Sequence, residues 1–419
     1  MPQKIDRRTF LRLAGLGGGA TMLGCGGPGG AGRLAGFAST ATTAPPVAPA
    51  GAVPVGQRTL LVIEMPGGND GLSTAPPLGD GRLHDLRPTI AHADAEVLAV
   101  DDSFGLHPGL ARLHGRGVAV VGGVGSSRPD ESHFEMQRRW WAGDEAGDTG
   151  VTGGFLGRLC DALDEGAPVT GLSVGGASTP ALLAERAGTL GLPDPGWLWW
   201  LSDDGDEWSA AFRAGLGDMA AIDGADPVGL AMARKGLADG LRVGDLVLDL
   251  PEMSGYPETY LAQKLWLAAR MLASGTGLRV VHVPMDGGFD SHEDHRGSHD
   301  PLMDELDQAV DAFLADVDAS GLGGSVLVAT TSEFGRRPAE NDSAGLDHGT
   351  ASVALLAGPV EGGLVGELPS LRDLDDDGNL RSTCTLADYY GTLASAWFDV
   401  DPAAVVPGGA SPLPVVVRT

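Results

Sequence analysis

The densest group of potential metal ligands in the sequence lies in residues 286–295, which read DGGFDSHEDH. Asp290, His292 and His295 belong to this segment, and His299 follows at the start of a predicted helix. Carboxylate oxygens and imidazole nitrogens together suit a divalent cation such as zinc or manganese, with calcium as a further candidate. The alternative is a solvated loop of aspartates and histidines. We favour metal binding.

A second polar segment, GGNDGLS at residues 67–73, contains Asp70. Its glycines allow the backbone to turn tightly, so that Asp70 would face a ligand bound at this point. A plain turn is the alternative, because Asn, Asp and Gly all tolerate left-handed backbone geometry. Taken alone, the segment favours the plain turn.

A third segment, SSRPDESHFE at residues 126–135, opens a predicted helix that continues through Gln137 and Trp140. Ser132 and Glu135 have the spacing of a capping box, which would explain both residues without catalysis. A helix N-terminus also stabilises anions, so Ser132 could instead attack a phosphate or sulfate ester. The cap is the favoured role, and nucleophilic attack is the alternative.

A fourth segment, TTSEFGRR at residues 330–337, places Glu333 directly after a predicted buried strand, and Asp347-His348-Gly349 follows it. A buried carboxylate is costly unless a cation or hydrogen bonds meet it. Arg336 is one candidate partner. A structural ion pair between Glu333 and Arg336 therefore stays open beside metal binding.

An acidic segment, DLDDDG at residues 373–378, matches the beginning of an EF-hand calcium loop. Cys384 occupies the position where that loop needs a bidentate glutamate, and no pair of flanking helices is evident. We therefore predict an acidic turn.

These segments need a scaffold that brings them together, and the pattern after Arg58 predicts one. Short apolar or β-branched runs alternate with helical patterns, which indicates an α/β fold with a doubly wound, mostly parallel sheet flanked by helices. Ligands of such sheets bind beyond the carboxyl ends of the strands, where the four polar segments lie. A long helix is predicted over residues 301–317. Strands are predicted over residues 60–65, 118–121, 172–174, 278–284, 325–329 and 353–356.

Between residues 193 and 257 the pattern loosens into acidic sequence that is rich in tryptophan. We interpret this stretch as an insertion that caps an edge of the sheet. Ordinary connecting helices with buried tryptophans are the alternative. The tryptophans are Trp197, Trp199, Trp200 and Trp208.

The formal net charge of the 419-residue chain is -28. Nucleic acid is an unfavourable partner for such an acidic protein, because phosphate binding needs a basic face. The charge suits an exported protein and the binding of divalent cations. Outside the N-terminal segment the cysteines are Cys160 and Cys384, which would allow one disulfide but no disulfide framework.

Residues 1–25 are predicted to be a twin-arginine signal, which exports a protein already folded. Arg7 and Arg8 precede Phe-Leu and an apolar, glycine-rich run over residues 13–24. That run is too short for a transmembrane helix, which needs roughly 20 residues. The sequence MLGC ending at Cys25 resembles a lipobox with Met22 in place of the usual leucine, so lipidation of Cys25 stays open.

Residues 26–57 are almost uncharged and consist mainly of Gly, Ala, Pro, Ser and Thr, which predicts a flexible tether before a single domain over residues 58–419. The expected partner during export is the twin-arginine translocase. The protein would contact the membrane only through its signal or a lipid. Its expected location is therefore periplasmic, extracellular or membrane-anchored by a lipid at Cys25.

Taken together, five motifs resemble the exported family known as domain of unknown function 1501, in order and spacing, over nearly everything after the tether. That family is similar to the alkaline-phosphatase-like superfamily, which includes phosphatases, sulfatases and phosphoglycerate mutases. The resemblance implies an alkaline-phosphatase-like sheet with a two-metal site. The motifs are GGNDG at 67–71, SHF at 132–134, FDSH at 289–292, SEFGR at 332–336 and DHG at 347–349.

The resemblance also implies roles for the candidate residues. Two cations would lower the pKa of the nucleophile and stabilise the attacking and leaving oxygens. The implied roles are metal binding by Asp70 with Glu333 and by Asp290 with His292 and His348, nucleophilic attack by Ser132, and contact with the charged ester oxygens by His133 or Arg336.

The sequence departs from the phosphatases at two points. Glu333-Phe334 stands where they place an Asp-His pair, so one metal site loses a histidine. Asp290 and His292 are closer in sequence than the matching phosphatase ligands, so His295 stays an alternative ligand. Neither Cys160 nor Cys384 begins the Cys-x-Pro-x-Arg run of the formylglycine sulfatases.

The predicted function is an exported, metal-dependent hydrolase of phosphate or sulfate esters, carried by small molecules or polymers. The alternative from another class is a non-catalytic exported binding or surface-assembly protein that keeps the fold. A third interpretation is an anion- or sugar-binding protein that uses the tryptophan-rich insertion.

Overall fold

The computed structural model describes residues 58–147, 150–175, 179–192, 207–221, 228–248 and 253–418. The predicted signal over residues 1–25, Cys25 and the tether over residues 26–57 lie outside the described residues, as do Trp197, Trp199 and Trp200. Among the described residues, none of the helices is both long and apolar enough to cross a membrane.

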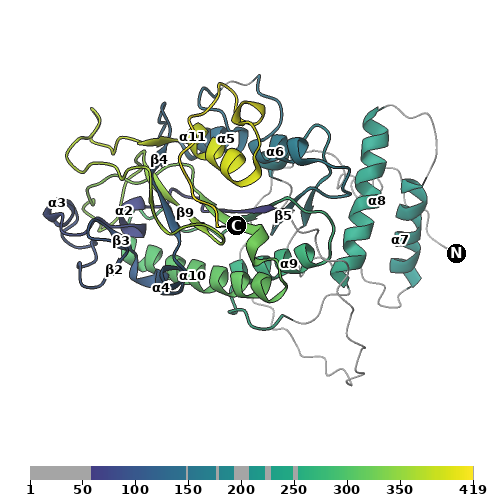
Figure 1. Cartoon of the computed structure of the whole chain (residues 1–419), viewed down its shortest axis with the longest axis horizontal. Coiled ribbons are helices and arrows are strands. Elements are labelled where there is room, and N and C mark those ends of the chain that lie inside the picture. Colours follow the sequence, from purple (N-terminus) through teal and green to yellow (C-terminus); the bar gives the residue numbers. More distant parts are fainter. Residues whose placement is uncertain are drawn as a thin grey trace.

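One large sheet forms the centre of the molecule, in the strand order β10-β4-β9-β8-β1-β7-β5-β6, with β11 beside β4 (Figure 1). Within this described sheet β9 runs antiparallel to its neighbours β4 and β8, and the other pairs are parallel. The predicted mostly parallel α/β fold is therefore confirmed. The strands are β1 (Thr59–Glu64), β4 (Ala119–Gly125), β5 (Gly171–Val174), β6 (Thr189–Leu192), β7 (Val280–Pro284), β8 (Val326–Thr331), β9 (Ser352–Ala357), β10 (Gly363–Val365) and β11 (Cys384–Thr385).

The burial of β1 shows that the sheet is covered on both faces. Leu61 and Ile63 pack into one hydrophobic core, whereas Leu60 and Val62 pack into another. Successive side chains of a strand point to opposite faces, so a strand that buries both sets lies between two layers of helices. The sheet is thus doubly wound, as predicted.

The two layers of helices are visible on opposite sides of the sheet in Figure 1. The helices of the first layer are α4 (Ala111–Arg116), α9 (Tyr260–Ala273) and α10 (His295–Ala319). Those of the second layer are α5 (His133–Ala142), α6 (Phe155–Leu163) and α11 (Leu386–Thr392). Smaller elements are α2 (Gly71–Thr74), α3 (Gly81–Leu86), and the antiparallel pair β2 (Leu98–Ala99) and β3 (Gly105–Leu106).

Helix α10 is longer than the helix predicted over residues 301–317. The sequence places Pro301 at the beginning of the helix, because proline lacks the N–H group that an interior position uses. In the structure the helix begins six residues earlier, at His295, and Pro301 lies inside it. His295 and His299 lie in these additional turns, and both side chains are buried.

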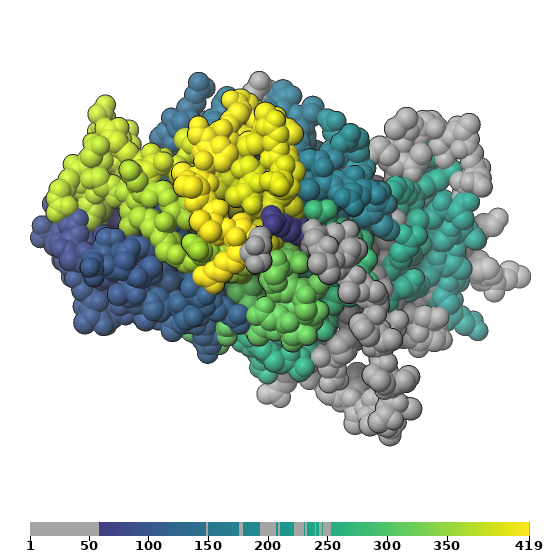
Figure 2. Space-filling model, viewed as in Figure 1, coloured from purple at the N-terminus to yellow at the C-terminus, as the bar shows by residue number. Residues whose placement is uncertain are grey.

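Two helices follow β6 in the region that we interpret as an insertion. They are α7 (Glu207–Ala220) and α8 (Val228–Leu248). Helix α8 contacts β6, which is the edge strand of the sheet. Figure 2 shows these helices, in teal, at one end of the molecule.

The two cysteines of the folded region do not form the disulfide that the sequence left open. Cys160 and Cys384 are both buried and free. Burial raises the pKa of Cys384 to about 12, so its thiol is protonated at neutral pH.

Candidate metal centre

Four side chains converge at the carboxyl edge of the sheet, and we call them the four-ligand cluster: His133, Asp290, His292 and His348. Nε2 of His348 lies 3.1 Å from Nε2 of His133 and 3.0 Å from Nε2 of His292. Oδ1 of Asp290 lies 3.1 Å from Nε2 of His292, 3.2 Å from that of His348 and 3.5 Å from that of His133. Ligand atoms of His133, Asp290 and His348 all lie within 4.8 Å of one another, and His292 joins them through its contacts with Asp290 and His348.

The other ring nitrogen of each histidine faces an acceptor. The Nδ1 contacts are His133 to Glu333 Oε1 at 2.8 Å, His292 to Asp347 Oδ1 at 3.3 Å and His348 to the backbone oxygen of Glu131 at 2.7 Å. A carbonyl or carboxylate oxygen only accepts, so a neutral ring in this position carries its proton on Nδ1 and offers the lone pair of Nε2 to a metal ion. Such outer acceptors are typical of metal-binding histidines. The converging lone pairs and carboxylate repel one another unless a cation lies between them, so the cluster fits a divalent metal ion.

The connections after β7 and β8 and the start of α5 supply the cluster. Asp290 and His292 follow β7, and His133 is the first residue of α5. His348 lies between β8 and β9, in an antiparallel bridge with Arg336. The loop after β1 packs closely against this region, because a Cβ atom at Gly67 would lie only 2.6 Å from the backbone nitrogen of Asp290.

Arg336 fixes the loops around the cluster from within the protein. Its side chain is fully buried and donates hydrogen bonds to Asp290 Oδ1 at 2.7 Å and to backbone oxygens. Those oxygens belong to Gly67, Gly68, Phe289 and Leu346. Partial burial by itself would raise the pKa of Asp290, but the bond to Arg336 and its charge lower it to about 2. All three guanidinium nitrogens are therefore committed to protein acceptors.

Glu333 lies behind His133. It is buried, and Oε1 also accepts a 2.8 Å hydrogen bond from the backbone nitrogen of Gly67. The hydrogen bond from His133 to Glu333 raises the pKa of His133, although burial opposes the shift. The ion pair with Arg336 that the sequence left open is wrong, because Glu333 pairs with His133 and Arg336 pairs with Asp290.

Asp70 has a different partner from the one that the resemblance implies. Its carboxylate forms a two-pronged ion pair with Arg87, at 2.6 and 2.9 Å, and both side chains are 1% exposed. It also accepts the backbone N–H of Ser73 and caps α2. Burial by itself would raise the pKa of Asp70, but Arg87 and His295 hold it well below its usual range. The structure thus places Asp70 and Glu333 in separate networks.

His295, the alternative ligand, is buried at the start of α10. Its Nδ1 lies 2.7 Å from Ser291 Oγ, and its Nε2 lies 3.1 Å from Ser73 Oγ. Both ring nitrogens therefore have protein partners outside the four-ligand cluster.

The acidic turn over residues 373–378 was predicted correctly, since Asp375 accepts the backbone N–H groups of Asp377 and Asn379.

Ser132 is exposed and caps α5, which confirms the favoured capping role. Its hydroxyl oxygen accepts from the backbone nitrogen of Glu135 at 3.4 Å, a long hydrogen bond. The Glu135 carboxylate pairs with Arg138 and Arg139 instead of accepting the backbone N–H of Ser132. Only one of the two hydrogen bonds of the predicted capping box is therefore formed. Within the described part of the chain, the Ser132 hydroxyl donates to no protein acceptor.

The sequence analysis missed a second cluster, formed by His92, His107 and Asp300. Nε2 of His107 lies 3.0 Å from Nε2 of His92 and 3.1 Å from Oδ1 of Asp300. Here Nδ1 of each ring faces a donor: the backbone nitrogen of Gly109 for His107 and the guanidinium of Arg296 for His92. These donors favour protons on Nε2 over the lone pairs that a metal needs, so the second cluster fits a metal ion less well than the four-ligand cluster does.

The stability of the protein is expected to fall as the pH drops from 6.5 towards 4. Burial, with the charges of His92 and Arg296, lowers the pKa of His107 to about 4. The unfolded chain takes up a proton near pH 6.5, whereas the folded protein resists it until about pH 4. Between these values the unfolded state is favoured by up to about 3 kcal/mol. Urea unfolding at pH 7 and at pH 4.5 measures the effect.

A His107→Asn variant is the matched control for that experiment. The Asn side chain has an acceptor near the position of Nδ1 for the Gly109 N–H group, but it does not titrate. The pH dependence of the variant should be shallower. Equal slopes for the two proteins would contradict the assignment to His107.

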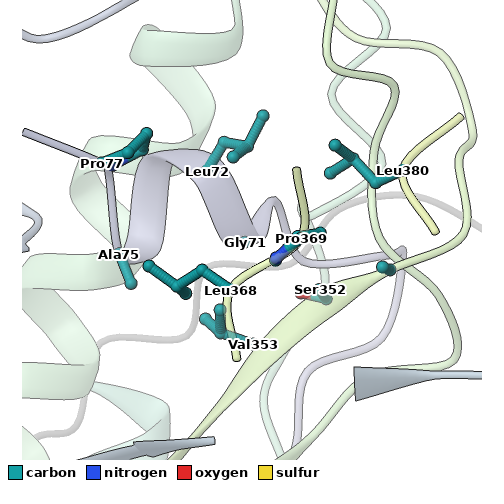
Figure 3. A pocket seen from close by; sticks show the side chains of 10 residues that line it. Gly71, Leu72, Ala75, Pro77, Ser352, Val353, Leu368, Pro369 and Leu380 are labelled. Atoms are coloured by element: carbon teal, nitrogen blue, oxygen red, sulfur yellow. The ribbon is translucent and has the colours of Figure 1, made fainter. Parts of the chain in front are cut away.

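Two hollows lie away from the four-ligand cluster. Figure 3 shows the smaller, an apolar cavity of about 20 Å³ that is lined by Leu72 of α2, by Ala75 directly after α2, and by Val353, Leu368 and Leu380. It has room for one water molecule, but its lining offers few polar partners. The larger, of about 750 Å³, is open and includes Asp144, Glu145 and Asp388 in its lining.

Comparison with solved structures finds proteins of low sequence identity. One is the lipoteichoic acid synthase LtaP from Listeria monocytogenes, with 9% identity over 84% of this chain and 74% of that chain and a TM-score of 0.38. A sulfatase from Pseudoalteromonas sp. has 10% identity over 85% and 70%, with a TM-score of 0.39. The C-terminal periplasmic domain of EcEptC from Escherichia coli, in complex with zinc, has 12% identity over 84% and 87%, with a TM-score of 0.38.

No curated protein matches the sequence. A family model does match, over a segment that contains Asp290, His292 and His348 of the four-ligand cluster together with Glu333 and Arg336. The resemblance inferred from the sequence is thus confirmed for this segment: residues 249–381 match the family described as "Protein of unknown function (DUF1501)".

Proposed function

We propose that this protein is an exported, metal-dependent hydrolase of phosphate or sulfate esters, with its cation held by the four-ligand cluster. The observation that carries the proposal is the orientation of the three histidines, whose Nε2 atoms converge with Asp290 while each Nδ1 faces an acceptor. A single site of three nitrogens and one oxygen favours zinc, then manganese, over calcium, which prefers oxygen ligands.

A bound divalent cation would offset charge on the ester oxygens and lower the pKa of an attacking hydroxyl. Ser132 is the candidate nucleophile, because its exposed hydroxyl precedes His133 in the chain and lies at the N-terminus of α5. The helix N–H groups at that position favour negative charge. Arg336 acts by positioning Asp290 and the surrounding loops.

The proposed reaction has two displacements. The Ser132 hydroxyl loses its proton to solvent, and its oxygen bonds to the phosphorus or sulfur of the ester. The bond to the leaving alcohol breaks, and the alcohol takes up a proton. Water then attacks the same atom and releases inorganic phosphate or sulfate, or a phosphate monoester from a diester, while Ser132 recovers its proton.

Export remains part of the proposal and rests on the twin-arginine pattern in residues 1–25. A folded passage would let the protein acquire its metal before it leaves the cytoplasm. The periplasm, the exterior, or a membrane surface reached through lipidation of Cys25 are the proposed destinations.

The deciding experiment measures metal content and hydrolysis on the same preparation. We expect near one zinc or manganese per chain, and hydrolysis of p-nitrophenyl esters that stops with a chelator and returns with the metal. Ser132→Ala should keep the metal and lose the activity. Protein that holds the metal but cleaves no ester would favour the non-catalytic binding or surface-assembly alternative. Protein that holds no metal would contradict the proposal at its basis.

A further inference from the structure

Two adjacent arginines near the four-ligand cluster have opposite orientations. Arg336 pairs with His348 in an antiparallel bridge, and successive residues of an extended segment point to opposite sides. The Arg336 side chain is fully buried, whereas the Arg337 side chain is 38% exposed. The inner arginine fixes the loops, and the outer one reaches solvent.

The Arg337 guanidinium lies beside two groups that orient the histidines of the cluster. One of its nitrogens is 3.6 Å from Glu131 Oε1, too far for a hydrogen bond. Asn341 and His292 lower the pKa of Asp347, and the nearby charge of Arg337 contributes to the same shift. The backbone oxygen of Glu131 holds His348, and the Asp347 carboxylate holds His292.

The donors of Arg337 are uncommitted. Among the residues that the structure describes, its side chain has the single long ionic contact with Glu131 and donates no hydrogen bond. Arg336, by contrast, uses all three of its nitrogens on protein acceptors. An exposed guanidinium with free donors is suited to bind the oxygens of a phosphate or sulfate group, which it contacts in a planar, forked geometry.

The charges around the cluster limit the charge of the ligand. Asp290 is balanced by Arg336, and the three histidines are neutral when they bind a metal ion through Nε2. The negative charges of three further carboxylates then offset the positive charges of a divalent cation and of Arg337. These carboxylates belong to Glu131, Glu333 and Asp347. The loaded site is close to neutral, so it has little positive charge left to balance a doubly charged ester.

We propose that Arg337 binds the anionic group of the substrate and that the site takes a singly charged ester, either a sulfate monoester or a phosphodiester, in preference to a dianionic phosphate monoester. This inference rests on the proposed function. It moves the contact with ester oxygens from Arg336, where the sequence resemblance placed it, to the neighbouring side chain.

The test compares the parent protein with Arg337→Ala and Arg337→Lys, at pH 8 and with the metal loaded. The substrates are p-nitrophenyl sulfate, bis(p-nitrophenyl) phosphate and p-nitrophenyl phosphate, of which only the last carries two charges at this pH. The parent should have its highest kcat/KM with one of the singly charged esters. The better substrate of the two shows whether the site takes a sulfate monoester or a phosphodiester. Arg337→Ala should lower that value by roughly 10- to 100-fold, and Lys should restore part of it.

Binding gives a readout independent of turnover. Methanesulfonate, a singly charged anion, should raise the Tm of the metal-loaded parent, and Arg337→Ala should lose this rise while its metal content stays unchanged. Arg116→Ala is the matched control. Arg116 has a similar exposure and pairs with Asp311. It is the last residue of α4 and precedes β4, so it lies at the amino edge of the sheet, away from the cluster.

The outcomes separate the inference from the proposed function. A parent that cleaves none of the esters contradicts the proposed function, and methanesulfonate binding then decides the role of Arg337 alone. A parent that prefers p-nitrophenyl phosphate keeps the function but overturns the charge preference. An Arg337→Ala variant that matches the parent in kcat/KM and in methanesulfonate binding, or that loses its metal, overturns the direct contact.

Discussion

His348→Ala is expected to lose its bound metal while the protein stays folded. Nε2 of His348 lies within 3.2 Å of a ligand atom of each of the other three members of the cluster, so its removal opens the coordination shell. Changing only a supporting residue typically weakens metal binding by 10- to 100-fold, so loss of a ligand should exceed roughly 100-fold. Metal content after dialysis, and competition with a chelator for the affinity, measure the effect.

A graded series sharpens that test. Glu333→Gln leaves the four ligands in place and alters the carboxylate that accepts from His133 and from the Gly67 N–H group, so it should weaken binding by roughly 10- to 100-fold. His84→Ala is the matched control, because His84 is exposed and bonds Asp94. Metal retained in full by His348→Ala would contradict the cluster as the binding site. Two metal ions per parent chain would restore the two-metal arrangement that the resemblance implies.

Asp70→Asn is expected to destabilise the protein strongly without changing its metal content. The substitution leaves the Arg87 guanidinium buried and uncompensated, with only neutral acceptors such as the backbone oxygens of Arg337 and Pro338. Breaking a buried ion pair by removing one partner typically costs about 3–5 kcal/mol. The free energy of unfolding in urea, measured beside the metal content, checks both halves of the expectation.

The control for Asp70 is an exposed ion pair. Asp373→Ala breaks the contact with Arg381, where both side chains are more than half exposed, and it should cost less than about 1 kcal/mol. The double variant Asp70→Asn with Arg87→Met should recover part of the lost stability, since no charge is left buried. If Asp70→Asn instead loses metal at unchanged stability, Asp70 is a metal ligand and its assignment to a structural ion pair is wrong.

The strands of the sheet were predictable because their signal is local. Each of the six predicted strands matches a strand of the large sheet, since a buried parallel strand is a short, nearly continuous apolar run. The short edge strands β6, β10 and β11 were missed. The direction of β9 was also missed, because the pattern of buried residues along a strand is the same whether it runs with its neighbours or against them.

The direction of β9 decides where His348 lies. The connection from β8 to β9 leaves the carboxyl end of β8, and it carries both Glu333 and His348. Because β9 runs antiparallel to β8, it begins at the same edge of the sheet. A parallel β9 would begin at the opposite edge and carry the end of this connection away from Asp290. The cluster therefore depends on a strand direction that no local motif specifies.

By itself the sequence determined the class of fold, the edge of the sheet where the polar segments gather, and that Asp290, His292 and His348 are candidate ligands. Only the tertiary structure decided which of the other polar side chains join them. Asp70 and His133 are both adjacent to turn or cap signals, and sequence spacing does not tell their roles apart. Arg87, distant from the motifs, neutralises Asp70, whereas Glu333 orients His133 towards the centre. A charged side chain takes the nearest compensating partner in space, and that partner is set by packing.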